Sequence, residues 1–135
     1  MTSVQKTRKV TAAEAGDYAA KAREYLEVAS ESLNLGRYNA TTSMAIHAGI
    51  CAADAVSGGR QGVRSAAPDH SQTVKLVATA GKDGQEAAKY LRRLLPLKTR
   101  AEYDSMPISK QQAEKAFRAA ERLVALSDAV MASLR

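Results

Sequence analysis

The sequence predicts an all-α fold, a helical bundle of about five helices with one short third helix. Apolar residues make up 45% of the chain, yet there is no Trp and only one Phe, and Ala and Leu dominate. Ala and Leu favour helices, whereas aromatic residues favour strands. Apolar positions recur at helical spacing, and we find no strand pattern and no internal repeat. We expect a disordered basic tail over residues 1 to 10 and one helical domain over residues 11 to 135.

The first helix is expected over residues 12 to 34. Thr11 and Glu14 have the spacing of a capping box, in which hydroxyl and carboxylate each satisfy a free backbone amide. Gly36 supplies a left-handed residue just beyond the helix. Both ends of this helix are therefore marked in the sequence.

The second helix is expected from about residue 37 to residue 57, where Gly58 and Gly59 break the pattern. It is apolar nearly all round, which is typical of a central helix with neighbours on several sides. A loop over residues 58 to 68 follows, then the short third helix over residues 69 to 79.

Asp83 is expected to cap a fourth helix that reaches residue 103, with a kink or break at Pro96. Ser109 and Gln112 form a second capping box at the start of the fifth helix. Its core face is expected to carry Ala113, Ala116, Phe117, Ala120, Leu123, Val124, Ser127 and Met131.

The chain is basic, with a formal net charge of +6 and a pI near 9.6. Such a balance favours polyanionic partners, chiefly nucleic acid. Half of the excess comes from Lys6, Arg8 and Lys9 in the expected tail. The alternative is a solvated basic surface that only keeps the protein in solution.

Several classes of site and location are disfavoured. Cys51 is the only cysteine and lies among Ala and Ile, so we interpret it as a core residue. We expect no metal and no cofactor, because the two histidines lack ligand spacing and no phosphate-binding glycine loop or nucleophile elbow occurs. No apolar run of about 20 residues predicts a membrane span, and no secretory signal is found, so we expect a cytoplasmic protein.

The second helix carries a polar stripe at helical spacing, formed by Asn39, Ser43, His47 and Asp54. Polar groups on an otherwise buried helix need partners, because unpaired burial costs about 1–3 kcal/mol per group. The stripe either joins helices through an internal network or faces a ligand-binding groove. We keep both interpretations.

The fourth helix concentrates positive charge, in Lys89, Arg92, Arg93, Lys98 and Arg100. Arg100 follows the expected kink at Pro96 and is suited to clamp a phosphate with its two-pronged guanidinium group. Alternatively, it forms an ordinary ion pair with Asp104 one turn away. His70, at the start of the third helix, is either a general base or a group that satisfies the helix terminus.

Six segments occur in an order and spacing that are distinctive together: residues 20–29, 36–40, 43–55, Asp69-His70, 94–104 and 113–117. They resemble the helices of HEPN domains over roughly residues 12 to 133. The resemblance implies a helical bundle that usually forms a homodimer. Many members are metal-independent ribonucleases, often toxins paired with a nucleotidyltransferase-like antitoxin.

The ribonuclease motif of that family is an Arg followed after four to six residues by a His. Arg100 matches the Arg, but the His positions hold Ser105, Met106 and Pro107. The resemblance also suggests that Asp54 corresponds to the polar residue that accompanies the Arg. If the polar stripe faces Arg100, the Asp54 carboxylate should lie within hydrogen-bond or one-water reach of it.

The favoured hypothesis is a non-catalytic HEPN-like module that binds RNA or a nucleotide, within a toxin–antitoxin or defence pair. Phosphates would be held by Arg100, Lys98, Arg93 and Arg60, and the polar stripe would line the groove. One alternative is an endoribonuclease with a rearranged site, in which Arg100 stabilises the phosphorane and His47 or His70 transfers protons. Another is a protein–protein interaction module.

Overall fold

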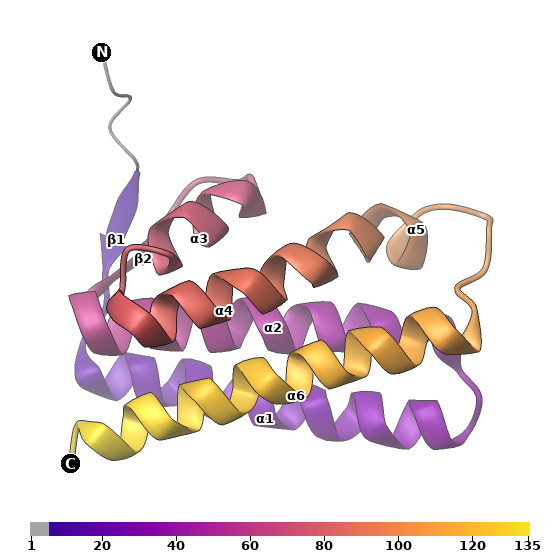
Figure 1. The fold of residues 1–135 in the computed structure, drawn as a ribbon, viewed down its shortest axis with the longest axis horizontal. Helices are drawn as coiled ribbons and strands as arrows, with labels where there is room; N and C mark the ends of the chain where they lie inside the picture. The colour runs from indigo at the N-terminus through magenta and orange to yellow at the C-terminus, as the bar shows by residue number, and fades with distance from the viewer. Residues whose placement is uncertain (1–5) are drawn as a thin grey trace.

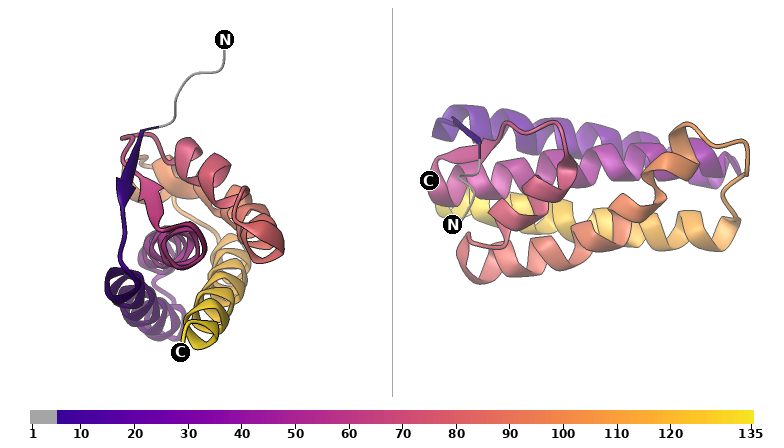
Figure 2. Two further views of the ribbon diagram at one scale, coloured as in Figure 1. Left: turned by 90° about the vertical axis from the view of Figure 1, so that its left-hand side faces the viewer. Right: turned by 90° about the horizontal axis from the view of Figure 1, so that it is seen from above.

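The long helix α2 (Tyr38–Gln61) lies at the centre of the computed structural model, which describes residues 6–135 (Figure 1). It packs against α1 (Ala12–Asn34) on one side and α6 (Lys110–Ser133) on another, and α4 (Gly81–Leu94) covers part of the remainder. Viewed along the bundle, the four helices surround a shared core, with α3 (His70–Val77) beside α4 (Figure 2). The all-α fold predicted from the sequence is confirmed.

Small residues allow the helices of this core to approach closely. α2 contributes fully buried alanines and Ile46, and larger side chains from its neighbours fill the space between the alanines: Leu91, Leu94 and Leu123, like Ile46, are 0% exposed. A Cβ atom added at Gly49 would lie 2.5 Å from Cδ1 of Leu94, closer than side chains normally pack. Within residues 6–135, no helix has both the length and the apolar character needed to cross a bilayer.

The helix ends marked in the sequence are confirmed for α1 and for the start of α6. Thr11 and Glu14 form the complete capping box, and so do Ser109 and Gln112. Gly36 follows α1 with a φ of 72°, a conformation that glycine adopts without steric penalty. These signals are local, so a single sequence is enough to locate them.

The predicted end of the second helix is wrong, because α2 continues through Gly58 and Gly59 to Gln61 and ends at Gly62. The two glycines serve close packing instead. An added Cβ at Gly58 would lie 2.6 Å from Val10, and one at Gly59 would lie 2.8 Å from Val130. The stop is Gly62, whose φ is 71°.

The absence of strands was also wrongly predicted, as was disorder throughout residues 1 to 10. β1 (Thr7–Lys9) pairs antiparallel with β2 (Val63–Ser65) in a two-stranded sheet at one end of the bundle (Figure 1). The Val10 amide extends the attachment by donating to the Gly62 carbonyl at 2.8 Å. Strands this short carry no alternating pattern, so the pairing is set by the tertiary structure. Residues 1–5 of the expected tail lie outside the described residues.

The expected fourth helix is divided into three pieces: α4, the 3₁₀ turn η1 (Leu95–Leu97) and the short helix α5 (Lys98–Glu102). Pro96 lies in the first turn of η1, as expected for a residue that cannot donate a helical hydrogen bond. Asp83 does not cap α4 as predicted; the N-cap is Ala80, and Asp83 lies inside the first turn. Figure 1 shows α5 turning away from the line of α4.

Candidate anion-binding site

The first three residues of the polar stripe predicted on α2 meet two different partners. Asn39 accepts a hydrogen bond from the Ile108 amide at 2.8 Å, which ties α2 to the segment before α6. Ser43 and His47 both contact Glu102 of α5. The stripe therefore joins helices at its first residue and meets a charged cluster at the next two.

Glu102 is the centre of that cluster. Its Oε1 lies 3.1 Å from His47 Nε2 and accepts a hydrogen bond from Ser43 Oγ at 3.2 Å. Its Oε2 accepts a hydrogen bond from Lys98 Nζ at 2.6 Å, one turn away on α5. Burial opposes ionisation of Glu102, but the hydrogen bond and charge of Lys98 lower its pKa overall. The same hydrogen bond raises the pKa of Lys98, so both groups are charged at neutral pH.

Both histidines of the chain lie near Glu102, since His47 contacts it and the charges of Glu102 and Lys98 act on His70. The His47 ring lies beside Tyr25 of α1, with ring centroids 5.6 Å apart. Burial lowers the pKa of His70, and the charge of Lys98 lowers it further, with smaller effects from Asp69, His47 and Glu102. His70 is therefore neutral at physiological pH and can accept a proton or a hydrogen bond.

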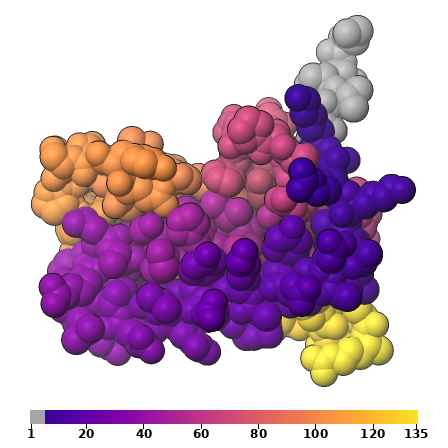
Figure 3. All heavy atoms as spheres, turned by 180° about the vertical axis from the view of Figure 1, so that it is seen from behind, coloured from indigo at the N-terminus to yellow at the C-terminus, as the bar shows by residue number. Residues whose placement is uncertain are grey.

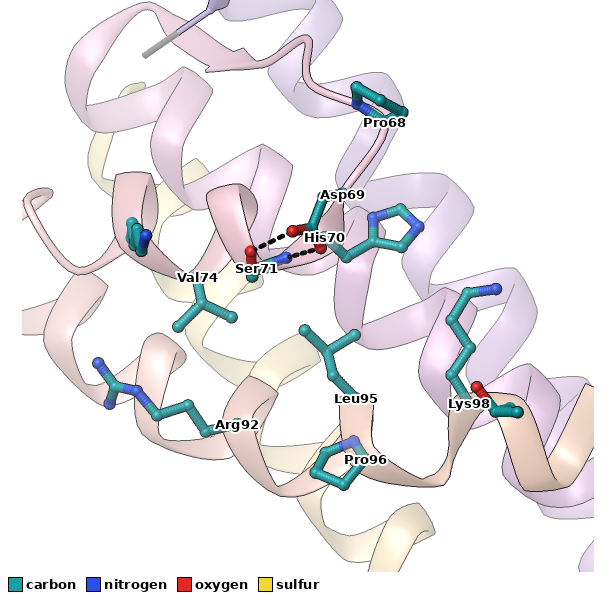
Figure 4. Close-up of a pocket in the computed structure, with 11 residues that line it drawn as sticks. Pro68, Asp69, His70, Ser71, Val74, Arg92, Leu95, Pro96 and Lys98 are labelled. Carbon is teal, nitrogen blue, oxygen red and sulfur yellow. Dashed lines mark hydrogen bonds between the residues drawn. The ribbon is translucent and has the colours of Figure 1, made fainter. Parts of the chain in front are cut away.

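A pocket of about 840 Å³ opens beside His70, between α3 and the run from α4 through η1 to α5 (Figure 4). Its basic groups come from three helices: Lys75 from α3, Arg92 from α4 and Lys98 from α5. Val74, Leu95 and Pro96 supply apolar surface. Seen from behind, α3 and α5 protrude separately above α2 (Figure 3).

The one carboxylate in the pocket lining, Asp69, is already engaged. Its Oδ1 accepts a hydrogen bond from the Ser71 amide at 3.0 Å, and its Oδ2 accepts one from the Ser71 hydroxyl at 2.6 Å (Figure 4). Asp69 is thus the N-cap of α3. Basic side chains outnumber acidic ones around the pocket, so the site favours an anion.

Asp54 belongs to a different cluster, and the prediction that it approaches Arg100 is wrong. Its Oδ2 lies 3.7 Å from Nη1 of Arg64, a residue of β2. α5 meets α2 at Ser43 and His47, and Asp54 lies about 10 Å beyond His47 along the helix axis. Burial raises the pKa of Asp54 to about 6, against the opposing charge of Arg64. The guanidinium group of Arg64 also lies over the Tyr18 ring, 5.4 Å from its centroid.

The predicted set of phosphate-binding residues does not converge on one spot. Lys98 lines the pocket, but Arg60 pairs with Asp83 at 2.7 Å, and Arg93 lies over the Tyr90 ring at 5.2 Å. Arg100 is half-buried on α5. Its Nε is buried, and within residues 6–135 no hydrogen-bond partner reaches it.

The sequence did not reveal every residue of these clusters. Glu102 was not identified as a candidate, although its spacing of four from Lys98 is a recognisable helical ion pair. Arg92 was identified only as part of the positive charge of the fourth helix, and Lys75 was not identified, because only the packing of α3 beside α4 places both in one pocket. Arg64 could not be paired with Asp54 before β2 was known.

Comparison with known families agrees with this architecture. The family model for the HEPN domain matches residues 15–130, most of the chain. The chain belongs to the HEPN family. HEPN domains are helical bundles that include nucleotide-binding and ribonuclease-like modules, and the resemblance seen in the sequence is confirmed. Among curated proteins, none matches the chain significantly.

Proposed function

We propose that this HEPN domain binds RNA or a nucleotide through its phosphate groups, in the pocket between α3 and α5. The observation that carries the proposal is that Lys75, Arg92, Lys98 and neutral His70 line one pocket. The only acid of the lining, Asp69, is occupied in capping α3. Val74 and Leu95 offer apolar surface for a sugar or base.

Lys98 is the residue on which binding should depend most. It lines the pocket and also donates a hydrogen bond to Glu102, so a bound phosphate would share or take over this ammonium group. Arg92 is exposed and adds a forked donor suited to phosphate oxygens. The missing motif His supports a binding role without hydrolysis.

The test is a titration of labelled oligouridylate at two salt concentrations with Lys98→Ala and Arg92→Ala. Each variant should weaken binding about tenfold and flatten the salt dependence, because binding releases fewer counterions when one phosphate contact is lost. Lys82→Ala is the matched control, since Lys82 is exposed on α4 and lies outside the pocket lining. Absence of binding at low salt, or equal affinities for Lys98→Ala and Lys82→Ala, contradicts the proposal.

A metal-independent endoribonuclease is the second candidate, and one observation favours it. His47 contacts Glu102 at 3.1 Å, and His70 lies close enough to both for their charges to affect it. Two imidazoles at one site could remove the proton from a 2′-hydroxyl and supply one to the leaving oxygen. Arg100, on the same helix as Glu102, is the candidate for stabilising the phosphorane.

Cleavage of cellular RNA in the presence of a chelator tests this candidate. Activity should be lost in His47→Ala and in His70→Ala, and it should fall steeply in Arg100→Ala. Binding that persists in the histidine variants while wild-type protein cleaves nothing supports the non-catalytic module. Cleavage that survives all three substitutions indicates a contaminating nuclease.

Family membership also supports proposals about assembly and setting. We propose that the protein forms a homodimer, has a nucleotidyltransferase-like partner, and acts in a toxin–antitoxin or defence pair. We also propose a cytoplasmic location. Sedimentation of the purified protein tests the dimer. Purification from the native host tests the partner: one stoichiometric protein that excludes RNA would favour the interaction module instead.

A further inference from the structure

A second basic hollow lies on the other side of α4. It has a volume of about 860 Å³ and runs between α6 and the α4–η1 segment. Four of its lining side chains are basic, and one is acidic: Arg93, Lys115, Arg118 and Arg122, with Glu121. Tyr90, Pro96, Leu97 and two alanines of α6 supply the apolar surface.

The basic side chains of this hollow form few strong ion pairs within residues 6–135. Arg118 pairs with Glu114 at 3.3 Å, but its side chain is 67% exposed, so that pair contributes little. Arg93 lies over the Tyr90 ring. Lys115 and Arg122 are exposed, and within residues 6–135 neither forms an ion pair.

The two hollows adjoin along the end of α4. Pro96 lines both of them. Arg92 lines the first and its neighbour Arg93 lines the second, because consecutive helical residues point about 100° apart. α3, α4 and α6 follow one another across the face seen in Figure 1. Positive charge therefore extends from one hollow to the other over a single helix end.

We propose that the two hollows form one path for a single strand of RNA, which crosses the end of α4 at Pro96. The inference rests on the proposed function and sharpens it: the ligand is a polymer, with one phosphate beside Lys98 and the following backbone beside Lys115 and Arg122. Charge complementarity selects this occupant, because a mononucleotide held at Lys98 would leave the cations of the second hollow unmatched.

The experiment measures how much affinity is gained when the probe is lengthened from diuridylate to an oligouridylate of about 12 nucleotides. Wild-type protein should bind the longer probe much more tightly. Lys115→Ala/Arg122→Ala should lose about tenfold of that gain, and its salt slope should fall by about 1.4. Lys21→Ala/Lys82→Ala removes the same charge from exposed sites outside both hollows and should keep the full gain.

Circular dichroism verifies that each double variant is folded. The proposed path is contradicted if Lys115→Ala/Arg122→Ala keeps the full gain in affinity with probe length, or if wild-type protein binds both probes equally. Either result leaves the proposed function of the first pocket intact. If no probe binds at low salt, the proposed function itself fails. A wild-type dimer that dissociates in this variant without RNA assigns the hollow to a second copy and overturns the path.

Discussion

The two ends of α2 carry polar side chains in very different surroundings. Near the start of the helix, Ser43 and His47 meet Glu102, whose charge is balanced by a 2.6 Å hydrogen bond from Lys98. Near the other end, Asp54 is only 6% exposed and has Arg64 at 3.7 Å. The first cluster adjoins an open pocket, whereas the second lies under β2.

The quality of the pairing accounts for the contrast. A separation of 3.7 Å is too long for a hydrogen bond, so Arg64 offsets only part of the burial of Asp54. The pKa values follow: burial dominates for Asp54 and raises its pKa, while Lys98 prevails for Glu102 and lowers its pKa. We infer that the Asp54 end attaches the strand β2 and that the Glu102 end serves binding.

Removing Arg64 should have the largest effect. Arg64→Ala should lower the free energy of unfolding by about 3 kcal/mol near neutral pH, because it removes both the counter-charge of buried Asp54 and the contact of the guanidinium group with the Tyr18 ring. The loss should shrink at about pH 4.5, where Asp54 is protonated. Urea unfolding at both pH values measures it. Arg8→Ala is the control, because Arg8 lies opposite Arg64 in the sheet; an equal loss in that variant would contradict the role of Asp54.

Neutralising Asp54 should have the opposite sign. Its folded-state pKa of about 6 is above the ordinary 3.8, so the native state holds the proton between these values. Stability therefore falls as pH rises through that window and stays lower above it. Asp54→Asn should abolish this fall and should be more stable than wild type by about 2 kcal/mol near neutral pH, with little difference at low pH. Thermal unfolding across the window checks the sign; a variant less stable at neutral pH would show a net favourable ion pair.

Neutralising Glu102 should affect binding more than stability. Glu102→Gln should change the unfolding free energy by less than about 1 kcal/mol, because the cluster is partly solvated. It should raise phosphate affinity about threefold by freeing Lys98. Asp104→Asn, two residues away and exposed, is the matched control. Weaker binding or lost cleavage in Glu102→Gln would instead show that this carboxylate positions His47.

Arg100 should give the smallest effect. It lines neither hollow, and Arg100→Lys keeps the charge. We expect the free energy of unfolding to change by less than about 0.5 kcal/mol, with RNA affinity within about twofold. Fluorescence titration measures the affinity. A large loss of affinity with unchanged stability would place the guanidinium group in contact with phosphate.

Local signals could be read from the sequence, and tertiary contacts could not. The capping boxes at Thr11 and Ser109 depend on residues three apart, so they were predicted correctly. Gly58 and Gly59 looked like helix breakers, because the contacts with Val10 and Val130 that require them come from distant segments. The pairing of Asp54 with Arg64 could not be predicted either, because it depends on a sheet whose short strands have no alternating sequence pattern. His47, Ser43 and Lys98 were identified as polar and basic candidates, but their shared partner Glu102 was not.

The segment formed by η1 and α5 contains no fully buried residue. Lys98, Glu102 and Arg100 thus stand on a piece of backbone whose side chains are at most partly buried, while Ser43 and His47, which contact Glu102, belong to the central helix α2. Local opening of this segment should require much less free energy than global unfolding, so its amides should exchange with deuterium sooner than those of α2. For the same reason, side chains of η1 and α5 can be substituted without a large loss in the stability of the helical bundle.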